Sequence, residues 1–204
     1  NNMTLKGMIP GHDRFNNSFK TNIDYKILKN LTFTSNVTYA STHSNNIPST
    51  GDRQNNPLEA VYTVSHIPVE RMKEYWKPGL EGIQQNGLPG YDNPYFIAYA
   101  MKNGFSRDRI YGNLGITYDI TPELSVTARY SLDRYNETRE TKIPFSAWRM
   151  AKGNYSLQNI FFQEYNTDVL ATYKKKVSEW DFSVSAGGNI MNRRGAEIGR
   201  ASCR

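Results

Sequence analysis

The chain has 204 residues, a formal net charge of +6 and one cysteine, and 38% of its residues are hydrophobic. Its mean hydropathy is −0.68, and no segment approaches the roughly 18 consecutive apolar residues of a membrane-spanning helix. The composition therefore argues against a helical membrane protein. Basic residues are interspersed with acidic ones, so we expect no nucleic-acid partner, and the run from Lys174 to Lys176 is typical of a solvated turn.

The first patterned segment alternates apolar and polar residues over 15–27 and, after a turn, over 31–41. A period of two is the pattern of a β-strand with two chemically different faces. We therefore predict a hairpin with one apolar face and one polar face. The apolar face carries Phe15, Phe19, Thr21, Ile23, Tyr25, Ile27, Leu31, Phe33, Val37 and Tyr39.

Two further hairpins follow the same pattern. The second pairs 108–118 with 124–134 across a turn that contains Pro122, and the third pairs 160–173 with 180–190 across the basic turn. The expected fold class is all-β: an antiparallel up-and-down sheet of about six long strands.

Long connections separate the hairpins, from about 42 to 107 and from about 135 to 159. Irregular loops beyond roughly 12 to 15 residues are uncommon in compact domains, so we expect these connections to be folded. In the first connection, Asn56 and Asn93 each precede a proline, which predicts the start of a short helix at both places.

Residue types on the two faces indicate what each face contacts. The polar face includes Lys20, Asp24, Arg129 and Asp133, which a dry sandwich core could not hold unpaired. The predicted strands are about 9 to 13 residues long, which is close to the roughly 9 to 11 of a tilted membrane strand and longer than the roughly 5 or 6 of a globular one. Aromatic residues flank the short turns, as they do at a lipid headgroup boundary: Tyr25, Phe33, Tyr118, Tyr173, Trp180 and Phe182.

We therefore expect the apolar face to contact lipid, the short turns to be periplasmic and the long connections to be extracellular. Six strands do not close around a lumen, and open edges in lipid leave backbone groups unpaired. Residues 1–196 are thus expected to be an arc of a larger barrel, cut at both ends. A soluble secreted glycan-binding β-protein with one wet face is the alternative.

The C-terminal segment EIGRASCR, residues 197–204, departs from the preceding pattern. We interpret it as translated sequencing-adapter read-through and expect it to lie outside the fold. This exclusion removes Cys203, the only cysteine, and with it disulfide, zinc and thiol-nucleophile interpretations.

Motifs for catalysis or cofactor binding were not found. The three histidines do not have metal-ligand spacing, and the sequence has no phosphate-binding glycine loop or nucleophile elbow. Asp133, Glu137 and Glu140 flank the expected start of a loop, where solvation explains them better than acid–base catalysis. We expect neither an enzyme nor a cofactor.

Taken in order, several segments resemble the SusC/RagA type of TonB-dependent outer-membrane transporter found in Bacteroidetes. They cover nearly all of the chain except 197–204, and they are GMIPGHDRFNNSFKTNIDYKILKNLTFTSNVTYASTHSN, NNPLEAVYTVSHIPVE, DNPYFIAYAMKNGFSRDRIYGNLGITYDITPELSVTARYSLD and YNTDVLATYKKKVSEWDFSVSAGGN. The resemblance implies a barrel of about 22 strands around a plug. It also implies a SusD-like lipoprotein partner and TonB-powered import of oligosaccharides or peptides. A siderophore-type receptor of similar architecture is the second possibility.

Ligand contact is expected at aromatic residues of the long connections, because flat rings stack on sugars and pack against peptide side chains. The alternative is that these rings form small cores within the loops or contact a lid protein. On the strands, Arg129 and Asp133 would either line the solute path or pair with a plug. The aromatic candidates are Tyr75, Trp76, Tyr91, Tyr95 and Trp148.

Overall fold

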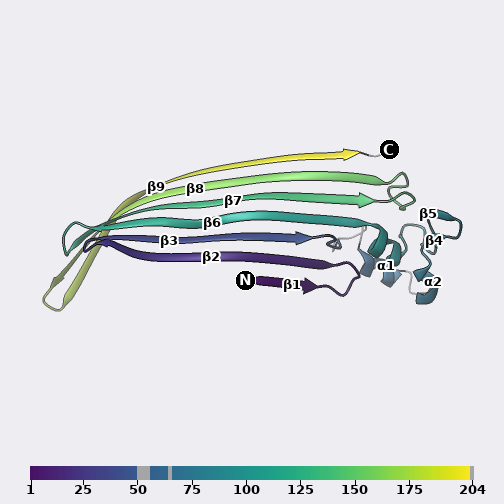
Figure 1. The fold of residues 1–204 in the computed structure, drawn as a ribbon, viewed down its shortest axis with the longest axis horizontal. Helices are drawn as coiled ribbons and strands as arrows, with labels where there is room; N and C mark the ends of the chain where they lie inside the picture. Colours follow the sequence, from purple (N-terminus) through teal and green to yellow (C-terminus); the bar gives the residue numbers. More distant parts are fainter. Residues whose placement is uncertain (50–55, 64–65, 203–204) are drawn as a thin grey trace.

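A single seven-stranded antiparallel sheet dominates the computed structural model of the chain, which describes residues 1–49, 56–63 and 66–202 (Figure 1). The strands are hydrogen-bonded in the order β1-β2-β3-β6-β7-β8-β9, so neighbours in the sheet follow one another along the chain. The all-β, antiparallel prediction is confirmed. The strands are β1 (Asn2–Lys6), β2 (Asp13–Leu28), β3 (Leu31–Ser44), β6 (Lys102–Asp119), β7 (Leu124–Ile143), β8 (Asn154–Val177) and β9 (Trp180–Ser202).

The strands are longer than the alternating pattern predicted, and β1 was not predicted. β7 continues to Ile143, so the prediction that a long connection begins near 135 is wrong. Beyond about residue 134, β7 carries polar residues on both of its faces. The alternation of apolar and polar residues therefore stops there, although the backbone of β7 stays paired with its neighbours. Glu140, predicted to be solvated near a loop start, instead lies in β7 and accepts hydrogen bonds from Lys142 and Tyr155, which lower its pKa.

Strand β9 also extends further than expected. Residues 197–202 pair with 155–160 of β8, so the prediction that this segment lies outside the fold is wrong for these residues. Backbone groups pair whatever the side chains are, which explains why the change in composition at 197 does not end the strand. Cys203 lies outside the described residues, and the adapter origin of the segment stays a prediction.

Cross-strand register aligns the apolar residues of successive strands on one face, as predicted. One continuous row runs through Tyr25, Phe33, Ile116, Ala128 and Val169. Many of these side chains are open to the surroundings: Phe19 is 70% exposed and Ile190 is 77% exposed. The described chain therefore contains nothing that covers this face.

We call the uncharged part of this face the apolar band. It begins at the level of Leu124 and Tyr173, near the short turns, and ends at the level of Leu132 and Tyr165. On β6 to β9 it consists of Gly112, Leu114, Ile116, Tyr118, Leu124, Val126, Ala128, Tyr130, Leu132, Tyr165, Thr167, Val169, Ala171, Tyr173, Val184, Ala186, Gly188, Ile190 and Asn192.

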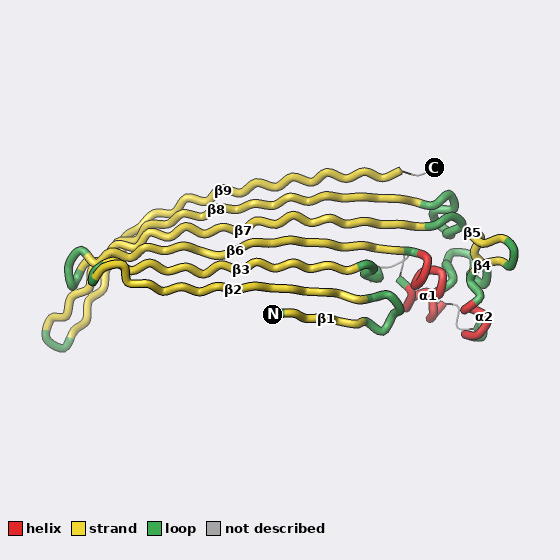
Figure 2. Tube along the Cα trace, viewed as in Figure 1, coloured by secondary structure: helices red, strands yellow, loops and turns green. Residues whose placement is uncertain are grey.

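The remaining elements gather at one end of the sheet, with the short turns at the other end (Figure 2). They are α1 (Pro57–Thr63), α2 (Val69–Lys73), the hairpin of β4 (Trp76–Lys77) and β5 (Leu80–Gln84), and the π-helix η1 (Phe96–Ala100). We call them the loop cluster. Among the described residues, no helix is long and apolar enough to cross a membrane.

Both predicted helix starts in the loop cluster are confirmed. The Asn56 side chain accepts a hydrogen bond from the Leu58 N–H at 3.2 Å, and the Asn93 side chain accepts one from the Tyr95 N–H at 2.8 Å. Helix α2 was not predicted, because the sequence pattern assigns Pro68 to the end of the first helix, whereas in the structure Pro68 precedes α2.

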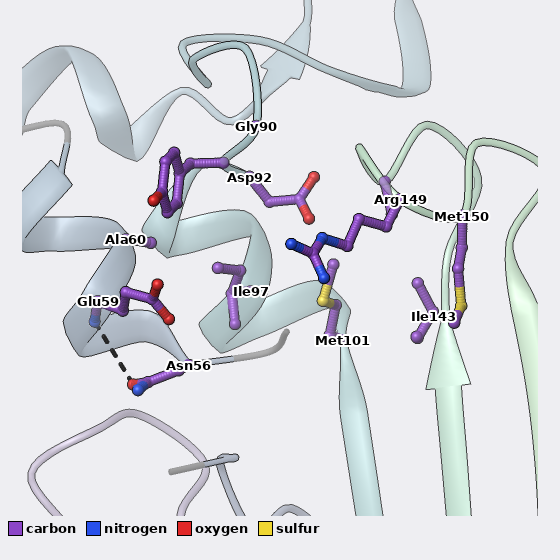
Figure 3. Close-up of a pocket in the computed structure, with 12 residues that line it drawn as sticks. Asn56, Glu59, Ala60, Gly90, Asp92, Ile97, Met101, Ile143, Arg149 and Met150 are labelled. Carbon is purple, nitrogen blue, oxygen red and sulfur yellow. Dashed lines mark hydrogen bonds between the residues drawn. The ribbon is translucent and has the colours of Figure 1, made fainter. Parts of the chain in front are cut away.

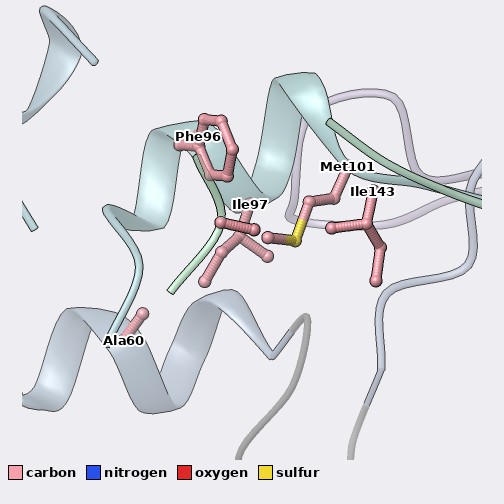
Figure 4. Close-up of a cluster of buried hydrophobic side chains, with 6 residues drawn as sticks. Ala60, Phe96, Ile97, Met101 and Ile143 are labelled. Atoms are coloured by element: carbon pink, nitrogen blue, oxygen red, sulfur yellow. The ribbon is translucent and has the colours of Figure 1, made fainter. Parts of the chain in front are cut away.

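A small apolar core holds the loop cluster to the sheet (Figure 4). Met101 immediately precedes β6 and Ile143 ends β7, so the core joins the helices to the ends of two adjacent strands. Its buried members are Ala60, Phe96, Ile97, Met101, Ile143 and Ala147.

Substitution of Gly112 should weaken the pairing of β3 with β6. A Cβ atom at Gly112 would lie 2.0 Å from the Asn36 carbonyl oxygen, and backbone cannot move aside as a flexible side chain can. We expect Gly112→Ala to destabilise the folded protein by roughly 1–3 kcal/mol, measured by urea unfolding in detergent. Gly188→Ala is the matched control, because nothing lies within 4 Å of its added Cβ. Equal urea midpoints of unfolding for the two variants would contradict the close approach of Gly112 to the Asn36 backbone.

Candidate functional site

The polar face of the sheet carries ion pairs between neighbouring strands. Arg129 donates from Nε to Asp168 Oδ1 at 3.1 Å. Asp133 accepts hydrogen bonds from Arg109 at 2.8 and 2.5 Å. The structure thus places both predicted inward-facing residues on the polar face, as expected, but pairs each with a residue on the adjacent strand. Their part in lining a solute path or meeting a plug stays a prediction.

Glu137 is the most deeply buried charged group of this face. It is 2% exposed and accepts a hydrogen bond from Arg107 at 2.6 Å and one from Arg139 at 2.5 Å. The prediction that this carboxylate is solvated at a loop start is therefore wrong. A buried carboxylate needs compensating charge, and two guanidinium groups from β6 and β7 supply it.

Aromatic rings lie between these ion pairs. Tyr135 and Phe162 stack with ring centroids 5.0 Å apart. Arg107 lies 5.1 Å from the Tyr135 ring centre and Arg193 lies 5.4 Å from that of Phe162, so a guanidinium contacts each ring. Arg193 also pairs with Glu164 at 2.7 Å.

We call this set the inner ladder. Sequence inspection missed most of it, because its partners are far apart in the chain and only register brings them together. Its positive and negative charges are nearly balanced. The inner ladder therefore offers aromatic rings for stacking and groups for hydrogen bonding rather than a strong electrostatic field. Its members are Arg107, Arg109, Arg129, Asp133, Tyr135, Glu137, Arg139, Phe162, Glu164, Asp168 and Arg193.

Three of the five predicted aromatic residues meet in the loop cluster. The Tyr75 ring lies 5.2 Å from that of Trp76 and stacks on Tyr99 at 6.2 Å, and Tyr95 stacks on the same Tyr99 at 6.1 Å. Tyr75 and Trp76 also pack against the buried core, and Trp76 meets Phe96 edge-on at 5.3 Å. This packing favours the alternative that they form the core of the loops.

Tyr95 and Tyr99 also line an open apolar groove of about 590 Å³. The groove lies between the β1–β2 turn, α1, α2 and the residues around η1. Its other lining residues are Met8, Ile9, Pro10, Pro57, Leu58, Val61, Ile67, Met72, Lys73 and Pro94.

Tyr91 and Trp148 lie apart from these rings. Tyr91 lines a cavity of about 30 Å³, into which Arg149 points beside Asp92 (Figure 3). Trp148 is 55% exposed, and its backbone N–H donates to Asp92 Oδ1 at 2.7 Å. The predicted aromatic residues therefore do not form one continuous site.

Asn93 fixes the arrangement of the loop cluster. It is fully buried, and its side-chain amide donates to the Met72 carbonyl at 2.9 Å and to the Gln85 carbonyl at 3.0 Å. Its side-chain oxygen accepts from the backbone N–H groups of Tyr95 and Phe96. One side chain thus ties α2, the end of the β4–β5 hairpin and η1 together.

Neither family models nor curated proteins match the chain. Solved structures do match. The RagAB peptide importer in the closed-closed state shares 15% identity at a TM-score of 0.65, over 94% of this chain and 22% of that chain. The open-open state of the same importer shares 16% identity at a TM-score of 0.65, over 94% of this chain and 21% of that chain. A further structure, of the RagAB peptide transporter, shares 16% identity at a TM-score of 0.63, over 94% of this chain and 22% of that chain.

These similarities show the fold. They support the resemblance to the SusC/RagA type at the level of the fold over 94% of the chain, while the barrel of about 22 strands and its plug stay predictions. The chain spans about a fifth of the length of the solved structures that it matches.

Loss of the Asn93 amide should loosen the loop cluster. Asn93→Ala leaves two carbonyls and two N–H groups without their partner, at a cost of roughly 1–3 kcal/mol for each buried group that stays unsatisfied. We expect faster limited proteolysis within residues 66–100, with the strands still protected. Tyr62→Ala, at a side chain that is 85% exposed on α1, is the control and should leave the cleavage rate unchanged. Equal cleavage of both variants would show that Asn93 does not hold the cluster.

Proposed function

We propose that the chain forms part of the wall of an outer-membrane β-barrel, with the apolar band in contact with lipid. The height of the band carries this proposal. From Tyr173 to Tyr165 the band advances eight residues along the strand, or about 27 Å, and a tilt of about 40° converts this into a height of about 21 Å. The flanking levels of Lys175 and Gln163 are about 31 Å apart in height, so the two values bracket the roughly 25 Å apolar zone of membrane barrels.

Aromatic residues at both edges of the band support the same placement. Tyr118, Tyr173 and Trp180 lie toward the short turns, while Tyr39 lies at the opposite edge. Rings with a polar atom are favoured at headgroup level. In this orientation the short turns at 29–30, 120–123 and 178–179 are periplasmic, and the loop cluster is extracellular.

We further propose that the complete barrel belongs to a transporter of the SusC/RagA type that imports peptides or oligosaccharides. Support comes from the fold shared with the RagAB structures, together with the polar inner ladder, which a water-filled or plugged lumen accommodates. A SusD-like lipoprotein would cover the extracellular loops, and TonB would supply the energy through segments outside this chain. The apolar groove of the loop cluster would suit either the lipoprotein or a ligand.

Charge placed on the apolar band should prevent stable insertion, whereas charge on the opposite face should not. Leu114 lies in the middle of the band, and its neighbour Asn113 points to the polar face. We expect Leu114→Arg to cost about 2–4 kcal/mol in lipid and Asn113→Arg to cost much less. The measurement is urea unfolding of the reconstituted protein, with the yield of folded protein in the outer membrane as a second readout. Equal losses would contradict the lipid contact, and a Leu114→Arg protein that is stable without detergent would favour a soluble β-protein.

Deletion of the gene should abolish accumulation of one solute class. Labelled oligopeptides, labelled oligosaccharides and a ferric siderophore would be supplied to wild-type and deleted cells, with and without a protonophore. We expect peptide or oligosaccharide uptake to depend on both the gene and the proton gradient. Loss of ferric siderophore uptake alone would point to the siderophore-type receptor instead.

A further inference from the structure

Arginine residues are found on both faces of β6 to β9, but their surroundings differ. On the polar face, each arginine of the inner ladder contacts a carboxylate: Arg107, Arg109, Arg129, Arg139 and Arg193. On the apolar face, Arg134 and Arg194 are exposed. Neither has a carboxylate partner within the part of the chain that the structure describes.

These two arginines lie side by side in one cross-strand row. Arg134 of β7 pairs with Gln163 of β8, which pairs with Arg194 of β9. Neighbouring strands are about 4.8 Å apart, so the two arginine backbones lie about 10 Å apart with the amide between them. Long guanidinium side chains reach across half that distance. The ring of Phe161 lies 5.3 Å from the Arg134 guanidinium carbon and restricts where it points.

The row is the first one beyond the apolar band, on the side away from the short turns. Leu132 and Tyr165 form the last uncharged level, and Arg134 with Gln163 forms the next. At the other edge of the band, Lys175 is the corresponding outward cation. In the proposed orientation the Arg134 row is therefore at the headgroup level of the outer leaflet, about 26 Å above Tyr173.

We propose that Arg134, Gln163 and Arg194 bind the phosphate of a lipid headgroup in the outer leaflet. The inference rests on the proposed membrane placement. Guanidinium groups donate paired hydrogen bonds to phosphate oxygens, and the Gln163 amide adds a further donor between them. The arginine stems lie along the apolar surface while their heads reach the boundary. An anionic ligand would balance the charge of these two outward guanidinium groups, neither of which contacts a carboxylate among the described residues.

Native mass spectrometry of the complete, delipidated protein in a neutral detergent tests the assignment. The probes are short-chain phosphatidic acid, short-chain phosphatidylcholine and inorganic phosphate. We expect phosphatidic acid to bind best and the double variant Arg134→Gln/Arg194→Gln to bind it about 25-fold less tightly, since each basic residue near an anionic surface contributes roughly a fivefold effect. The control Lys29→Gln/Lys175→Gln removes the same charge at the other edge of the band and should bind as wild type does.

Three results would overturn the proposal: equal affinity of the two double variants, no preference for phosphatidic acid over phosphatidylcholine, or inorganic phosphate bound as tightly as the lipid. The double variant Arg134→Lys/Arg194→Lys is the control for misfolding. It keeps both positive charges and should retain part of the affinity for phosphatidic acid. A different result would contradict the proposed membrane placement: a wild-type protein that does not insert into pure phosphatidylcholine vesicles, whatever its affinity for phosphatidic acid.

Discussion

The pairing register of the seven-stranded sheet is the constraint on which the other features of this protein depend. Side chains alternate between faces with a period of two, so a slip of one residue would move every apolar side chain to the polar face. The observed register keeps β2 to β9 in phase, which makes the uncharged band continuous across six strands. The same register brings the arginines and carboxylates of the inner ladder within reach of one another.

The strands continue well past the level where alternation ends. Beyond the apolar band, β7 carries polar residues on both of its faces, and cross-strand contacts such as those of Glu137 and Glu140 join it to its neighbours. The extension carries the loop cluster away from the band, and the core around Met101 and Ile143 fixes the cluster to the ends of β6 and β7. In the proposed placement, continuous paired strands carry the loops above the membrane.

Charged residues of the sheet fall into two groups with different physical roles. The carboxylates of the inner ladder balance the neighbouring guanidinium groups, so that face presents donors, acceptors and rings with little net charge. Arg134 and Arg194 on the apolar face lack such partners within the described residues, and their level coincides with the edge of the band. In the proposed function, the inner ladder would contact solute and the apolar band would contact lipid.

Much of this could be predicted from the sequence, because local alternation directly reports a two-faced strand. The three hairpins, their short turns, the outward aromatic residues and the helix starts at Asn56 and Asn93 are local patterns of this kind, and all are present. The ends of the strands, the burial of Glu137 and the separation of Trp148 from Tyr75 were not predictable, because each depends on partners distant in the chain. The sequence by itself determined which residues share a face, since that follows from the period of two. Only the tertiary structure decided which residues meet across strands and where pairing stops, because backbone hydrogen bonds join strands regardless of side chain.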